Sequence, residues 1–298
     1  MTSIPQLVIP WIPSGLVRFH PDVPPQVTAL FARCGLSAAT STAKVPRVMP
    51  IGALAEEPDD GSPIVALFDG KITAAHAPLL RGPRPPLLLA CRQTAEPTEW
   101  EVRAVAVLFA TAPLTAIAPV PSLAWRIGGA ADLRAVSQEA GLCVRQAGAG
   151  ASAAEIVTDV MYELAANAFF DAPHTDEGVA KYAHRRGLEV EFDPSDACRT
   201  SLAVAGGRAY LSAIDRFGRL TSAPIAAVVA GLGAKAQVNL AGGGAGLGLR
   251  RLLEHSDLWA VRITPTVVTE VLCVVDLRDT RRRGGNPKSL MFSSLAGR

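Results

Sequence analysis

The chain has 298 residues, of which 49% are hydrophobic and 19% are charged, and its formal net charge is +2 at pH 7. This length favours two domains, and the hydrophobic content supports a sizeable core and excludes global disorder. The nearly balanced charge gives no reason to expect nucleic acid or an anionic membrane as a partner.

The five cysteines stand without paired spacing. This pattern indicates reduced thiols rather than a disulfide framework or a zinc site. No apolar run approaches the length of a membrane span, and the first residues lack a basic segment followed by an apolar one. We therefore expect a cytoplasmic protein with no membrane segment.

Prolines punctuate residues 1 to about 45, where only 26–33 has a helical pattern. Beyond them, short apolar runs separated by turn residues are typical of buried strands: Val45 to Ile51, 64–68, 87–91 and 105–109. Residues 96–106 could instead form a helix. A further helix is predicted over 131–140, ended by Gly141.

This alternation predicts a small α/β domain over residues 1–146 with a largely buried sheet. Its strands and helices resemble those of a response-regulator receiver domain. However, Asp59, Asp60 and Asp69 do not form the acidic cluster that such a domain uses. We interpret this half as a regulatory or partner-binding module.

After a small-residue linker at 146–150, Ser152 and Glu155 have the spacing of a capping box. They open an apolar-periodic run that ends near Phe170 and predicts a helix. Glu163 and Asn167 stand four residues apart in it, so that a helix presents both on one side.

Strands are predicted next at 188–192, 200–204 and 209–214, the last two joined by a glycine hairpin. The last strand delivers Asp215 and Gly218 into a loop. A mobile segment is expected over 219–241, with a short helix at 223–229. Two closing strands are predicted at 258–263 and 269–277, and residues 279–298 are expected to form a flexible basic tail.

A glycine-rich stretch at 241–250 runs into a predicted helix. Its glycines place little steric restriction on the backbone, so that N–H groups can turn toward an anion. The apolar residues behind it, Leu247 among them, suit a helix whose N-terminus points back at the loop. The pattern is that of a phosphate-binding turn.

These motifs, in this order, resemble the ATP-binding domain of the GHKL superfamily, which includes gyrase, chaperone and sensor-kinase ATPases and the anti-sigma-factor serine kinases. The resemblance covers residues from about 150 to 278. It implies a two-layer α/β sandwich, the GHKL or Bergerat fold, over 151–278, and it implies ATP and Mg²⁺ as cofactors.

The resemblance also implies residue roles. Glu163 matches the general base, Asn167 the Mg²⁺ ligand, and Asp215 the carboxylate that accepts a hydrogen bond from the adenine amino group. The other matching positions belong to the nucleotide site: Gly218, Gly244, Gly246, Leu247, Gly248 and Thr269. Lys235, in the mobile segment, could neutralise phosphate charge.

Three residues depart from the family pattern. Phe217 and Arg219 stand where the first glycine box has glycines, and Phe217 is expected to narrow the adenine pocket or to stack on the base. Asp171 stands where many relatives have a basic residue. A carboxylate there is unfavourable beside polyphosphate unless a metal intervenes.

The sequence therefore predicts a signalling ATPase or a serine/threonine protein kinase of the anti-sigma-factor type, with a protein partner from a signalling pathway. The sequence leaves open whether the chain forms a homodimer. The alternative is a catalytically inactive GHKL scaffold that works by protein–protein binding, with Phe217 in the adenine space. A sensor autokinase is disfavoured, because no histidine lies in a phospho-acceptor helix.

Overall fold

The computed structural model describes residues 15–40, 45–69, 71–82, 84–92, 96–110, 112–183, 192–232, 245–278 and 288–295. In chain order, the elements are β1 (Gly15–Phe19), α1 (Pro25–Arg33), β2 (Leu36–Ala38), β3 (Arg47–Pro50), η1 (Ile51–Ala55), β4 (Ile64–Asp69), η2 (Ala74–Leu80), β5 (Leu87–Cys91), α2 (Glu99–Phe109), η3 (Leu114–Ile117), β6 (Leu123–Ile127), α3 (Ala130–Gln146), α4 (Ala151–Ala166), η4 (Asn167–Asp171), η5 (Pro194–Asp196), β7 (Cys198–Ala205), β8 (Arg208–Asp215), α5 (Ser222–Ala230), α6 (Ala245–His255), β9 (Leu258–Thr264), β10 (Val268–Asp276) and β11 (Ser289–Ser294).

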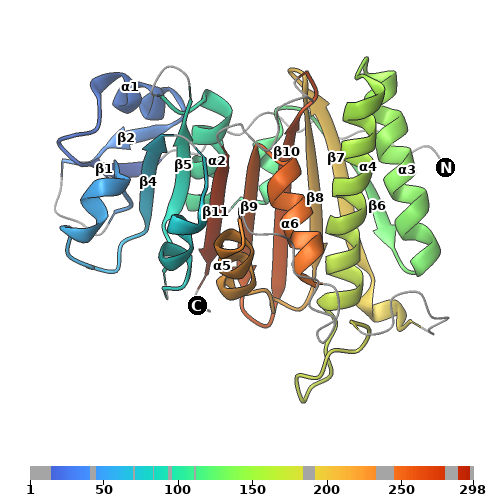
Figure 1. The fold of residues 1–298 in the computed structure, drawn as a ribbon. Helices are drawn as coiled ribbons and strands as arrows, with labels where there is room; N and C mark the ends of the chain where they lie inside the picture. Colours follow the sequence, from blue (N-terminus) through green and yellow to red (C-terminus); the bar gives the residue numbers. More distant parts are fainter. Residues whose placement is uncertain are drawn as a thin grey trace.

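The strands of the described segments form one 11-stranded sheet in the order β2-β1-β3-β4-β5-β11-β9-β10-β8-β7-β6 (Figure 1). The five strands from β2 to β5 are parallel to one another, which explains their continuous apolar runs. Beyond β11, the strands from β9 to β6 are antiparallel. The fold is therefore mixed α/β, as predicted.

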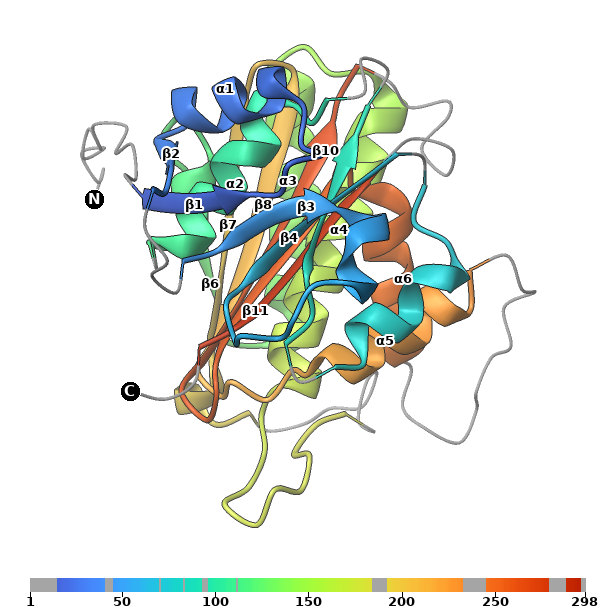
Figure 2. The ribbon, with the colours of Figure 1, turned by 90° about the vertical axis from the view of Figure 1, so that its left-hand side faces the viewer.

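Helices cover both faces of the sheet (Figure 2). One face carries α3, α4, α5 and α6, whose apolar side chains share a core with Trp259, Val261 and Leu211 of the sheet. The other face carries α1 and α2 over a second core that includes Leu89 and Leu272. The described residues thus build three layers, where the sequence predicted a two-layer sandwich after a separate small domain.

The segments on either side of residue 146 also share the sheet. Strand β6 pairs with β7, and α3 packs along α4, so both elements adjoin the later half of the chain. The predicted helix over 131–140 is present, but it continues through Gly141 as α3. A side chain at Gly141 would meet Thr158 of α4, so this glycine allows close helix contact instead of ending the helix.

Residues 105–109 lie in α2, so the strand predicted there is wrong and the helical alternative is confirmed. Thr98 and Glu101 explain the helix, because they form a capping box at its first turn. The capping box predicted at Ser152 is wrong. Helix α4 begins at Ala151 after the N-cap Gly150, which makes no side-chain capping bond.

Residues 288–295 do not belong to a flexible tail, as the sequence suggested. They form β11, a buried strand that is parallel to β9 and antiparallel to β5. Lys288 holds the start of this strand in place, because its Nζ donates to the carbonyls of Glu254 and Ser256 at the C-terminal end of α6. The strand joins the parallel and antiparallel parts of the sheet.

The other predicted strands and the short helix of the later half are confirmed within two residues at each end as β7, β8, α5, β9 and β10, and the helix after the glycines is confirmed as α6. Most of the strand predicted at 188–192 lies outside the described residues, as do Lys235 and Gly244. No helix in the described ranges is long and apolar enough to cross a membrane.

Candidate functional site

The glycine-rich helix α6 lies directly against the two polar residues of α4. A Cβ atom on Gly248 would stand 2.5 Å from Glu163 Oε2 and 3.5 Å from Asn167 Oδ1. A side chain at this position would push the end of the Glu163 side chain aside, so glycine allows the present close approach of α6 to α4. The structure thus brings together three residues that the sequence predicted as parts of one site.

Glu163 is only 6% exposed, and its charge is balanced by a residue that the sequence analysis did not single out. Arg251 of α6 donates from Nη1 to Glu163 Oε1 over 2.9 Å. The arginine lies three residues after Gly248, so one helix turn supplies both contacts. This spacing from the glycine was the signal in the sequence that could have pointed to the pair.

Asn167 marks a change of helix type. Helix α4 ends at Ala166, and residues Asn167–Asp171 form a π-helical turn closed by the Ala172 N–H on the Asn167 carbonyl at 3.0 Å. Such turns often occur at functional sites. The side-chain amide nitrogen of Asn167 is buried and has no hydrogen-bond partner among the described residues. The amide is therefore in place for a ligand.

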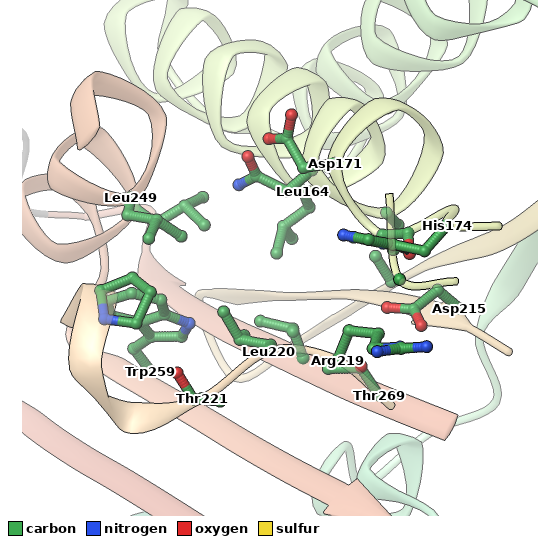
Figure 3. Close-up of a pocket in the computed structure, with 18 residues that line it drawn as sticks. Leu164, Asp171, His174, Asp215, Arg219, Leu220, Thr221, Leu249, Trp259 and Thr269 are labelled. Carbon is green, nitrogen blue, oxygen red and sulfur yellow. Dashed lines mark hydrogen bonds between the residues drawn. The ribbon is translucent and has the colours of Figure 1, made fainter. Parts of the chain in front are cut away.

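A cavity of about 380 Å³ opens beneath this turn, between the helices and the sheet (Figure 3). Its polar lining includes Asn167, Asp171 and His174 from the helix side and Asp215 and Thr269 from the sheet. Apolar side chains form the remainder, among them Leu164, Leu220, Pro224, Leu249, Leu252, Trp259 and Val271. A largely apolar pocket with a few polar groups suits a small organic ligand.

Asp215 ends β8 at one side of the cavity, opposite Thr269 of β10 in the strand register. Its Oδ1 accepts hydrogen bonds from the backbone N–H of Phe217 at 2.9 Å and of Gly218 at 3.4 Å. Burial raises the pKa of this carboxyl above its ordinary value, and hydrogen bonds from Phe217, Thr269 and Gly218 offset part of that shift. Burial of the charged form of Asp215 therefore lowers the free energy of unfolding.

This raised pKa predicts how stability changes with pH. A raised native pKa means that the folded chain binds the proton more tightly than the unfolded chain. The cost of burying the charge is therefore fully present above the native pKa and disappears below the unfolded value. We expect the wild type to gain stability relative to Asp215→Asn as pH falls from about 8 to about 4. Urea unfolding across this range measures the difference, and a loss of relative stability on acidification would contradict it.

Gly218 serves the turn after Asp215. Its φ is +59°, and a Cβ there would collide with backbone atoms of the β9–β10 hairpin at Thr264, Thr266 and Val267. We expect Gly218→Ala to destabilise the protein by about 2–4 kcal/mol, because backbone strain and overpacking add. Thermal or urea unfolding tests this. Gly150→Ala is the control, since its Cβ would meet nothing within 4 Å.

The two departures in this loop behave differently. Phe217 does not line the cavity, so the structure does not bear out the prediction that its ring fills or narrows an adenine pocket. Its backbone instead turns back to hydrogen-bond Asp215. Arg219 does line the cavity, on the same side as Asp215 and His174 (Figure 3).

Two further predicted site residues, Gly246 and Leu247, lie in the first turn of α6. Leu247 is 44% exposed and does not line the cavity. The residues that the sequence reading missed at the cavity are His174 and Trp259. In the described part of the chain, no cluster of three or more His, Cys, Asp or Glu could hold a metal ion.

Comparison with known proteins adds little to this geometry. No protein-family model matches the chain, and no curated protein matches it. Among solved structures, the chain is similar to one chain of the SiaB–SiaC complex from Pseudomonas aeruginosa, with a TM-score of 0.35 and 18% identity over 51% of this chain and 88% of that one. A likeness of this size carries no argument about function.

Proposed function

We propose that the chain binds Mg·ATP in the cavity between α4, α6 and the sheet, as a GHKL-type domain does, and that it acts as a signalling ATPase or an anti-sigma-type protein kinase. The observation that carries the proposal is the contact of Gly248 with both Glu163 and Asn167. It places a carboxylate, an amide and the start of a glycine-rich helix within one small volume.

The adenine base of the nucleotide would occupy the end of the cavity at Asp215. Two backbone N–H groups engage Oδ1 of this residue and Thr269 lies against the same carboxylate, whose remaining lone pairs would accept from an amino group. The apolar walls of the cavity suit a flat ring. Thr269 faces Asp215 across the strand pair and completes this end.

The Asn167 amide would hold Mg²⁺. The fit rests on the amide oxygen of Asn167, which lies beside the space that the missing Cβ of Gly248 leaves. An amide oxygen is a hard ligand suited to this cation, which when bound would neutralise phosphate charge. Glu163 would accept the proton of a water molecule or of a partner's hydroxyl group.

One observation favours the alternative of a non-catalytic scaffold. The Glu163 carboxylate is already engaged, with Arg251 on one oxygen and the backbone of Gly248 against the other. A base tied in this way must first exchange its partner before it can accept a proton. In that alternative, the domain contributes binding of a signalling protein, and no phosphate is released or transferred.

The decisive experiment combines binding with turnover. A non-hydrolysable ATP analogue is titrated with and without Mg²⁺, and phosphate release or transfer is measured for the wild type and for Glu163→Ala. The proposal expects retained binding and lost turnover in the variant. Turnover unchanged in the variant would remove Glu163 from the mechanism, and binding without any turnover in the wild type would favour the scaffold.

A further inference from the structure

Arg219 is a cation at the cavity that nothing in the described chain neutralises. It follows Asp215 by four residues, in the loop between β8 and α5, and its side chain makes no hydrogen bond or ion pair with any described residue. An arginine side chain brings five N–H donors in a fixed plane, which suits it to recognising the edge of a planar ligand.

The side chain of Arg219 is exposed to solvent and lies beside a second loop. Arg219 Nη1 lies 3.7 Å from where a Cβ on Gly178 would stand, so the guanidinium reaches across to the loop that follows η4. Gly178 has a φ of +83°, a conformation that favours glycine. The arginine therefore lies between two loops at the Asp215 end of the cavity (Figure 3).

The neighbouring polar groups at this end are mainly acceptors. Asp215 lines the cavity with its carboxylate, and His174 donates from Nδ1 to the Ala172 carbonyl at 2.8 Å, which leaves Nε2 as an acceptor in the neutral ring. Arg219 adds charged N–H donors beside them. The end of the cavity thus offers an acceptor and a donor side by side.

We propose that Arg219 is a second base-reading residue, which donates to a ring nitrogen of adenine while Asp215 accepts from the adjacent amino group. Adenine has this pattern on its edges, a donor amino group flanked by an acceptor nitrogen, whereas guanine presents acceptors at N7 and O6. With adenine, Asp215 and Arg219 each meet a complementary group. With guanine, the O6 acceptor would face the Asp215 carboxylate and be repelled by it. The inference rests on the proposed function of the site.

The test combines variants of the protein with analogues of the nucleotide. Dissociation constants are measured with Mg²⁺ for ATP, 7-deaza-ATP and 1-deaza-ATP, each of the latter lacking one ring nitrogen. The proteins are the wild type, Arg219→Met, which keeps side-chain length without the donors, and Arg216→Met. Arg216 is an exposed arginine of the same loop that does not line the cavity, so it is the matched control.

We expect the wild type to bind one of the two deaza nucleotides about tenfold more weakly than ATP. Arg219→Met should bind ATP about tenfold more weakly and lose that discrimination, while Arg216→Met should match the wild type. An Arg219→Met protein that still discriminates, or that weakens all three nucleotides by one factor, overturns the inference. Absence of any ATP binding by the folded wild type overturns the proposed function as well.

Discussion

Gly248→Ala is expected to lower the affinity for an ATP analogue by more than tenfold and to destabilise the fold by about 1–3 kcal/mol. The added Cβ would stand 2.5 Å from Glu163 Oε2, well inside the contact distance, in a helix that packs tightly on α4. Relief requires movement of the Glu163 carboxylate or of α6, and either movement disturbs the Glu163–Arg251 ion pair. Calorimetric titration and urea unfolding measure the two effects.

Gly52→Ala is the matched control, because a Cβ there meets nothing within 4 Å. It should leave both quantities close to those of the wild type. If Gly248→Ala binds the analogue as tightly as Gly52→Ala does, the close approach of α6 to Glu163 has no part in ligand binding.

Glu101→Ala should cost about 3–5 kcal/mol of folding free energy, since it removes a buried carboxylate that the half-buried Arg92 and the hydroxyls of Thr98 and Ser289 share. Glu101 is fully buried, and its carboxylate accepts from Arg92, from Thr98 and from the Ser289 hydroxyl at 2.7 Å. These partners come from the end of β5, from the start of α2 and from β11. The network therefore fastens the strand that joins the two parts of the sheet.

Glu99→Ala tests the same helix turn without this network. Glu99 is exposed, so its loss should cost no more than about 1 kcal/mol through the helix dipole. Chemical unfolding of both variants decides the matter. Equal stability of the two variants would show that the Glu101 network does not hold β11 in place.

The sequence predicted the later half of the fold well because its signals are local. The hairpin at Gly206–Gly207, the strand that ends at Asp215 and the helix after the glycines each follow from a few neighbouring residues. The four-residue spacing of Glu163 and Asn167 likewise gave their common side, and the structure places both beside Gly248. Features that depend on the pairing of segments far apart in the chain could not be predicted from such local patterns.

Strand β11 illustrates that limit. Its partners β5 and β9 lie far away in the sequence, and a glycine-rich basic stretch before it suggested a tail. The ion pair of Glu163 with Arg251 joins residues 88 positions apart, so the spacing of Arg251 from Gly248 points to it only once α6 is known to pack on α4. Arg219 was visible only as a departure from a glycine box, and its place at the cavity depends on how the loop turns at Gly218.

The central claim is that the cavity next to Asn167 and Asp215 binds Mg·ATP. Its most direct test is calorimetric titration of the wild type, Asn167→Ala and Asp215→Asn with a non-hydrolysable ATP analogue, with and without Mg²⁺. We expect the wild type to bind with a dependence on Mg²⁺ that Asn167→Ala loses, and Asp215→Asn to bind about tenfold more weakly. A folded wild-type protein that binds no analogue at millimolar concentration, or variants that bind as the wild type does, would contradict the claim.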